Sequence, residues 1–295
     1  MFTIKPVPPM SAALQRIAEI AGPLATVDRV HALPGGTHAR THLVQTANPE
    51  LDVVLREFPP GDDAAEREAR VLTALDGLGG LAPRLLASDV DGTWSGRPAV
   101  VISRLPGHAH VTPADPRDWA AQLGGALARI HAANLQRATG FERVFDRTGG
   151  SPGKLSGPAA ARVGADWEGI RSAPTVLTHY DYWSGNVLWQ GDVLSGVVDW
   201  SGAALGPAGF DLGWCRMDLY LLYDEHVAGA FLASYETATG SAVRDRSLWD
   251  LWAVARSHRD VEEWVENYQG VGRPDLTAAE LRRRHSAWTE LAARD

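Results

Sequence analysis

Three oxygen-bearing side chains lie at spacings that would let them act together. Asp181 and Asn186 are separated by four residues, and Asp199 follows Asn186 by thirteen positions, at the end of an apolar run. The residues between them predict a hairpin that turns at Gly191-Asp192. Because a loop followed by a short hairpin returns the chain to its starting point, the sequence predicts that the three side chains meet.

This set of side chains suits the transfer of a phosphoryl group to a hydroxyl. Such a reaction asks the protein mainly for positioning and for neutralisation of charge. One carboxylate must meet the attacking hydroxyl, and two further oxygen donors must hold Mg²⁺ against the phosphates. Because Mg²⁺ favours hard oxygen ligands and keeps several waters, one carboxylate and one amide suffice. The spacing therefore indicates magnesium-dependent phosphoryl transfer.

The N-terminal third has the pattern of a small antiparallel sheet with helices. Apolar residues at helical intervals predict helices over 11–21 and 62–78. Extended runs separated by Gly, Pro and Asn predict strands at 26–33, 41–46 and 51–58, and two more around Asp91-Gly92 within 90–103. The break at Leu105-Pro106-Gly107 predicts a boundary, which separates a domain at 1–104 from one at 105–295.

The rest of the chain is predicted to be mostly helical, apart from the hairpin and a Gly/Pro-rich loop at 148–158. The helices are expected at 118–133, 211–223, 226–239, 247–269 and 277–294. Strands followed by helices predict the α+β class, with a small antiparallel-sheet lobe before a larger helical lobe.

Composition narrows the class of protein. The chain has 295 residues, 45% of them hydrophobic, and Cys215 is its single cysteine, so a reducing cytoplasm is expected. It contains no run of 18 apolar residues, and its first ten residues lack the apolar core of a secretory signal, so no membrane segment is expected. A net charge of −8 argues against nucleic acid as a partner. Oligomeric state cannot be inferred.

Several other kinds of site are excluded by their motifs. Lys5 and Lys154 are the only lysines, and neither lies in the G-x-x-x-x-G-K-S/T context of a Walker A loop. Residues 77–82 match a dinucleotide fingerprint, but they follow a helix rather than a strand. No G-x-S-x-G elbow occurs, and the ten histidines form no H-E-x-x-H zinc motif.

Three motifs together resemble the aminoglycoside phosphotransferase family, a branch of the protein-kinase-like fold. His179-x-Asp181-x-x-x-Gly185-Asn186-Val187-Leu188-Trp189 is similar to its catalytic loop. Val197-Val198-Asp199-Trp200 is similar to its metal-binding strand end, and Gly206-Pro207-Ala208-Gly209-Phe210-Asp211-Leu212 is similar to the motif that follows. The resemblance runs from about residue 30 to 215. It implies an ATP-dependent, small-molecule kinase with a bilobal fold and ATP bound between the lobes.

The resemblance also implies roles for the motif residues. Asp181 would be the general base or the group that orients the hydroxyl, and Asn186 and Asp199 would be the Mg²⁺ ligands. His179 would brace the loop, and Asp211 would tie the backbone of the loop in place. Trp183-Ser184 stands where the family usually has His-Pro, which changes the wall that faces the substrate.

Nucleotide contacts are implied in the N-terminal part. Gly35, Gly36 and Thr37 would form the turn that covers the phosphates, although Gly35-Gly36 also suits an ordinary hairpin turn. Arg56 would take the place of the phosphate-contacting lysine, with Glu68 as its ion-pair partner; the alternatives are a surface arginine and a surface pair of Glu68 with a neighbouring arginine. Ser103 and Leu105 would offer the hinge groups to adenine.

The acceptor is left open by the sequence. Six carboxylates on the later helices could gather a cationic acceptor: Asp218, Asp224, Glu225, Glu262, Glu263 and Glu266. The hydroxyl acceptor could be an aminoglycoside-like antibiotic, or an amino alcohol or sugar of metabolism. A non-catalytic nucleotide-binding module is the alternative from another class.

Overall fold

The computed structural model describes residues 11–33, 38–134 and 140–294. Contacts within the chain divide it into two compact units. The first is Met1–Pro106 together with Trp200–Gly202, and the second is Gly107–Asp199 together with Ala203–Asp295.

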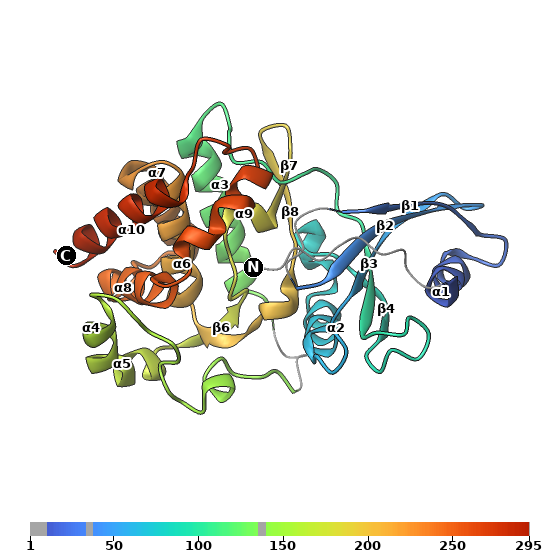
Figure 1. The fold of residues 1–295 in the computed structure, drawn as a ribbon, viewed down its shortest axis with the longest axis horizontal. Coiled ribbons are helices and arrows are strands. Elements are labelled where there is room, and N and C mark those ends of the chain that lie inside the picture. Colours follow the sequence, from blue (N-terminus) through green and yellow to red (C-terminus); the bar gives the residue numbers. More distant parts are fainter. Residues whose placement is uncertain (1–10, 34–37, 135–139, 295) are drawn as a thin grey trace. The chain divides into compact units, whose positions relative to one another are not determined.

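A five-stranded antiparallel sheet forms the first unit (Figure 1). Its strands are β1 (Thr26–Ala32), β2 (Arg40–Ala47), β3 (Leu51–Glu57), β4 (Leu85–Asp89) and β5 (Ala99–Ser103), in the order β1-β2-β3-β5-β4. The predicted meander of the first three strands is confirmed, with Val44 opposite Val53 in the β2–β3 pair.

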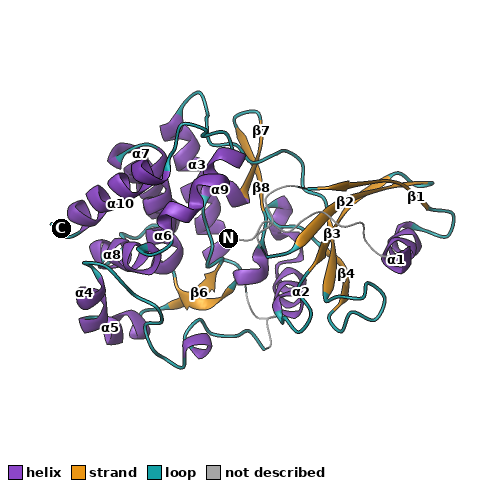
Figure 2. Ribbon diagram, in the orientation of Figure 1, coloured by secondary structure: helices purple, strands orange, loops and turns teal. Residues whose placement is uncertain are grey.

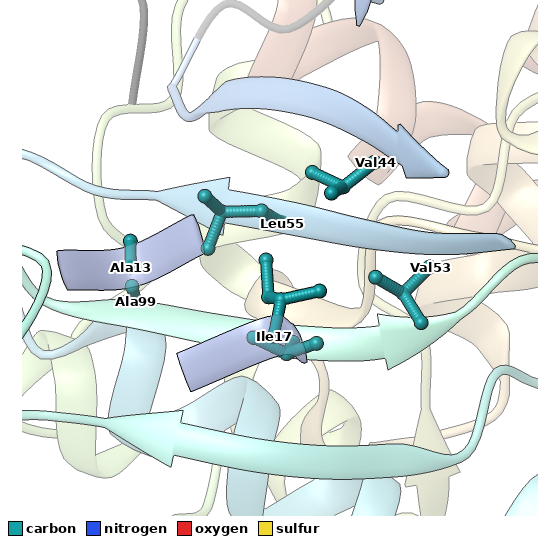
Figure 3. Close-up of a cluster of buried hydrophobic side chains, with 7 residues drawn as sticks. Ala13, Ile17, Val44, Val53, Leu55 and Ala99 are labelled. Atoms are coloured by element: carbon teal, nitrogen blue, oxygen red, sulfur yellow. The ribbon is translucent and has the colours of Figure 1, made fainter. Parts of the chain in front are cut away.

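The two faces of β3 have different partners. Val53 and Leu55 point to one face, where Ala13 and Ile17 of α1 (Ser11–Ala21) pack on them (Figure 3). Because side chains alternate along a strand, Arg56 points to the other face. There it meets α2 (Ala64–Leu75), which is followed by the 3₁₀ turn η1 (Asp76–Gly80).

The turn between β4 and β5 is wider than predicted. The prediction started the first strand at Val90, but β4 ends at Asp89. The carboxylate of Asp89 accepts hydrogen bonds from the backbone N–H groups of Thr93, Trp94 and Ser95. A carboxylate that satisfies three loop N–H groups holds the chain in a turn rather than in a ladder.

Helices dominate the second unit, as Figure 2 shows. Its longer helices are α3 (Pro116–His131), α6 (Gly209–Leu222), α7 (Glu225–Thr239), α8 (Arg246–Ser257) and α10 (Ala278–Ala292). Its short helices and turns are η3 (Asp146–Thr148), α4 (Ala160–Ala165), α5 (Trp167–Ser172), η4 (Ser184–Asn186), η6 (Val261–Trp264) and α9 (Val265–Gly270). The turn η5 (Trp200–Gly202) belongs to the first unit.

Two small sheets accompany these helices. The predicted hairpin is present as β7 (Val187–Gln190) and β8 (Val193–Val197). The other sheet pairs β6 (Thr175–Thr178) with β9 (Ala204–Pro207), which the sequence did not indicate. The expected α+β class, an antiparallel sheet followed by a mainly helical part, is confirmed. No helix in the described ranges is both long and apolar enough to cross a membrane.

The predicted helix 247–269 is interrupted, so that prediction was wrong. Helix α8 ends at Ser257, and α9 begins only at Val265. The guanidinium of Arg282 in α10 donates to the carbonyl oxygen of His258. A continuing helix would use that carbonyl for residue 262, so its capture by a side chain ends the helix.

Two adjacent glycines of α3 allow a test of how α3 packs against α7. A Cβ on Gly124 would lie 2.2 Å from the carbonyl oxygen of Phe231, whereas a Cβ on Gly125 would meet only Ser234 Oγ, at 3.8 Å. Gly124→Ala should therefore lower the free energy of unfolding by roughly 2 kcal/mol. Gly125→Ala should raise it by about 0.5–1 kcal/mol, because alanine favours the helix. Urea unfolding measures both, and a fully stable Gly124→Ala would contradict this packing.

Candidate active site

The second unit brings the three predicted oxygen donors together. Asp181 lies in the loop after β6, Asn186 ends η4, and Asp199 follows β8. The amide nitrogen of Asn186 donates to the carbonyl oxygen of Asp181 at 2.9 Å and to its Oδ2 at 3.1 Å. The backbone N–H of Val198 donates to the carbonyl oxygen of Asn186 at 2.9 Å, which returns the end of the hairpin to the loop.

The charge of Asp199 acts directly on Asp181. The pKa of Asp181 is raised to about 6, first by burial and then by the negative charge of Asp199. His179 and the hydrogen bonds from Asn186 and Trp214 oppose that shift. Two carboxylates that repel each other in a partly buried site would gain from a cation placed between them.

The donor set fits a hard divalent cation such as Mg²⁺. It consists of two carboxylates and one carboxamide, all oxygen ligands of the kind that Mg²⁺ prefers. Because the Nδ2 group of Asn186 is used on Asp181, its Oδ1 remains as the acceptor of the same side chain. Asp199 and Asn186 could hold the ion while Asp181 stays beside it.

Asp211 holds the start of the loop through backbone bonds. Its buried carboxylate accepts the N–H of His179 at Oδ2 and that of Tyr180 at Oδ1, both at 2.7 Å. Nε2 of His131 lies 3.1 Å from Oδ2 of Asp211. The loop is therefore fixed at two successive peptide groups.

The backbone is strained on both sides of this arrangement. Tyr180 has a φ of 65° and Asp199 a φ of 63°, in the left-handed region that non-glycine residues seldom adopt. Nε2 of the buried His179 lies 2.9 Å from the carbonyl oxygen of Val198, so it must be the donor in that bond. His179 thus links the loop to the strand that ends at Asp199.

The residues expected to contact the nucleotide lie in the first unit. Nε of Arg56 lies 3.1 Å from Oε2 of Glu68, with side-chain exposures of 8% and 0%, so the predicted pair is present and buried. Ser103 ends β5, and its hydroxyl accepts the N–H of Arg84 at 2.9 Å; Leu105 follows outside any strand. Gly35, Gly36 and Thr37 lie outside the described residues.

The six carboxylates considered for the acceptor have separate surroundings. Asp218 is buried, with its oxygens taken by the N–H of Ser184 and the hydroxyl of Tyr268. Asp224 caps α7, and Glu262 pairs with Arg282. The others, Glu225, Glu263 and Glu266, are exposed. Within the described ranges, no three acidic or histidine side chains cluster closely enough to share a metal ion.

Two residues that act on the site were missed by sequence reasoning. Trp214 opposes the rise in the pKa of Asp181, and the hydroxyl of Tyr268 donates to Asp218, which in turn holds the loop. Trp214 follows Asp211 by three residues on the same helix, a spacing that would have pointed to it. Tyr268 had no such signal, because it comes from a distant helix.

Residues 29–249 match the phosphotransferase enzyme family. A homoserine kinase of Rhodopseudomonas palustris is 32% identical over 195 residues, which are 59% of this chain and 58% of the relative. A homoserine kinase of Methylobacterium radiotolerans is 28% identical over 164 residues, or 49% and 50%. The chain spans about half the length of the curated relatives it matches.

Solved structures share the fold. A protein of Ralstonia eutropha, described as an aminoglycoside phosphotransferase, has a TM-score of 0.64 at 18% identity, over 95% of both chains. A mutant of aminoglycoside phosphotransferase APH(4)-Ia, in a ternary complex with AMP-PNP and hygromycin B, has a TM-score of 0.60 at 15% identity, over 95% of this chain and 98% of that one. The protein-kinase-like fold is confirmed.

Replacing Asp181 should stabilise the protein at neutral pH. The pKa of Asp181 in the folded chain, about 6, lies above its ordinary 3.8, so the folded form loses stability as the pH rises through that window. Without divalent cations, Asp181→Asn should therefore gain about 1–2 kcal/mol at pH 7.5 and almost nothing at pH 4. Urea unfolding in EDTA at both pH values tests this, with Asp192→Asn in the exposed hairpin turn as the control. A less stable Asp181→Asn at pH 7.5 would contradict the raised pKa of Asp181.

Proposed function

We propose that this chain, which belongs to the phosphotransferase enzyme family, transfers the γ-phosphoryl group of ATP to a hydroxyl of a small polar molecule. The observation that carries the proposal is the meeting of Asp181, Asn186 and the strand end at Asp199 on a loop held by Asp211. A protein of the same fold forms a ternary complex with AMP-PNP and hygromycin B, which supports a nucleoside triphosphate as the donor.

Asp181 would act on the acceptor hydroxyl. In the transfer, a bond forms between the acceptor oxygen and the γ-phosphorus, and the bond from that phosphorus to the bridging oxygen breaks. ADP leaves with the electron pair, and the hydroxyl proton passes to the Asp181 carboxylate. A carboxylate whose pKa is raised to about 6 accepts that proton more readily than an ordinary one. The amide of Asn186 donates to Oδ2 of Asp181 and so fixes the orientation of the carboxylate.

Asn186 and Asp199 would hold Mg²⁺. When bound, the ion neutralises the charge of the phosphates. The strained backbone at Asp199 aims its carboxylate in a direction that relaxed strand geometry would not give, and strain of this kind gathers at functional sites. The bond from His179 to Val198 keeps the strand end in place.

Arg56 would contact the phosphates of the nucleotide, positioned by Glu68. A guanidinium presents a planar fork of donors that suits two phosphate oxygens at once. Its burial beside Glu68 fixes the fork, since a buried charge keeps its partner. Gly35, Gly36 and Thr37 would cover the phosphates, and Ser103 and Leu105 would receive adenine.

The similarity of this chain to homoserine kinases supports an acceptor that carries both a hydroxyl and an amine. The purified protein should be screened with Mg²⁺-ATP against L-homoserine, amino alcohols, sugars and aminoglycosides, with ADP release as the readout. The proposal expects acceptor-dependent turnover with at least one of these compounds. Nucleotide binding without transfer to any of them would favour the non-catalytic alternative.

Asp181→Asn should abolish most of that turnover. Removal of a base that touches the reacting hydroxyl lowers kcat by roughly 10²–10⁴-fold. Binding of Mg²⁺-ATP, measured by calorimetry, should remain, because Asn186 and Asp199 are unchanged. Asp192→Asn serves as the control for the loss of one carboxylate. Full turnover by Asp181→Asn would contradict the role of Asp181 as the base that acts on the acceptor hydroxyl.

The variant Arg56→Lys tests whether the planar guanidinium of Arg56 matters beyond its positive charge. It keeps a cation beside Glu68 but loses the planar set of donors, so the KM for ATP should rise, by roughly tenfold, with the acceptor KM little changed. Arg16→Lys, at an exposed pair with Glu19, is the matched control. An unchanged KM for ATP in Arg56→Lys would remove Arg56 from the nucleotide site.

A further inference from the structure

We propose that Asp218 and Tyr268 are positioning residues for the catalytic loop, so that one face of α6 sets the loop at two points. This inference rests on the proposed function of that loop. Asp211 and Asp218 stand at positions i and i+7 of α6. At about 100° per residue, the two side chains leave the helix within roughly 20° of one another. They meet the loop at 179–180 and at 184.

Asp218 holds the middle of the loop. Its Oδ2 accepts the backbone N–H of Ser184 at 2.9 Å, and its Oδ1 accepts the hydroxyl of Tyr268 at 2.8 Å. Ser184, Asp218 and Tyr268 are all buried. Tyr268 belongs to α9, and its ring meets Trp183 of the loop edge-on, with centroids 5.8 Å apart. Tyr268 thus orients Asp218 and touches the loop beside it.

The opposite side of α6 is anchored to α8. A Cβ on Gly209 would lie 1.9 Å from the ring of Trp249, and one on Gly213 would lie 2.3 Å from the Trp249 carbonyl oxygen. Arg216 completes this side with a buried pair to Asp250, with Nε 2.9 Å from Oδ1. Positions 209, 213 and 216 lie roughly opposite 211 and 218 on the helix. A helix fixed on one side can hold a loop to a defined position with the other.

Two variants test the proposal through kinetics. Asp218→Asn keeps the shape of the side chain and loses the charge that accepts the Ser184 N–H, and Tyr268→Phe loses only the hydroxyl that orients Asp218. Both should lower kcat about tenfold while the KM values for ATP and acceptor change less than twofold, because a displaced carboxylate slows transfer without removing a binding contact. The double variant should fall short of the product of the two effects, since both act on one loop.

The matched controls remove similar bonds elsewhere. Trp167→Phe loses an indole N–H bond to the Gly150 carbonyl oxygen, at 2.8 Å. Ser257→Ala loses a buried hydroxyl bond to His285, at 2.9 Å. Both controls should keep the kcat of the parent protein even where their unfolding temperature falls as far as that of the test variants.

A second measurement does not depend on turnover. Amide hydrogen exchange of the nucleotide-free protein should show the Ser184 amide exchanging roughly five- to tenfold faster in Tyr268→Phe, and unchanged in Ser257→Ala. Parent-like kcat and parent-like Ser184 exchange in the test variants would overturn the inference and leave the proposed function intact. If the parent protein transfers phosphate to no acceptor, the proposed function falls, and the exchange result still decides whether α6 holds the loop.

Discussion

Two like charges held side by side are the constraint on which the site depends. Asp181 and Asp199 repel each other in a partly buried place, and the pKa of Asp181 rises to about 6 as a result of that burial and that charge. Such a pair separates unless the surrounding chain prevents it. Here the backbone bond from Val198 to Asn186 fixes the two chain segments, and the amide of Asn186 donates to Asp181. Hydrogen bonds from the surrounding chain thus hold the two carboxylates in place, and a bound cation would offset their repulsion.

The loop that carries Asp181 is held by two buried carboxylates, and each of them accepts hydrogen bonds from backbone N–H groups. Asp211 accepts two of them and Asp218 one. Hydrogen bonds to charged groups contribute more than neutral ones, about 1.5–3 kcal/mol each. This is of the size needed to offset the strain at Tyr180 and Asp199, about 1–3 kcal/mol each. The strained loop can therefore persist because α6, packed closely on α8, supplies acceptors at fixed points.

Local patterns predicted more of this molecule than distant contacts did. The alternation of apolar and polar residues, together with turn residues, predicted the meander β1–β3 and the hairpin β7–β8. The hairpin in turn predicted that Asp181, Asn186 and Asp199 come together. The end of α8 was not predicted, because it depends on Arg282, 24 residues after His258. Asp218 was singled out for its charge, but burial and the partners Ser184 and Tyr268 give it an internal role that only the packed chain shows. Polar residues of functional interest can thus be picked out in the sequence, whereas the residues that they contact are known only from the folded structure.

In the N-terminal unit too, a buried carboxylate holds a side chain proposed to act in phosphoryl transfer. Glu68 and Arg56 form a buried pair, and a buried ion pair contributes little to stability while it fixes the direction of each charge. Arg67, the residue before Glu68 in α2, donates from Nε to the carbonyl oxygen of Ser201 at 3.2 Å. Ser201 lies in Trp200–Gly202, the segment of this unit that follows Asp199 directly in the chain. Within this unit, helix α2 therefore holds both Arg56, through Glu68, and the segment Trp200–Gly202, through Arg67.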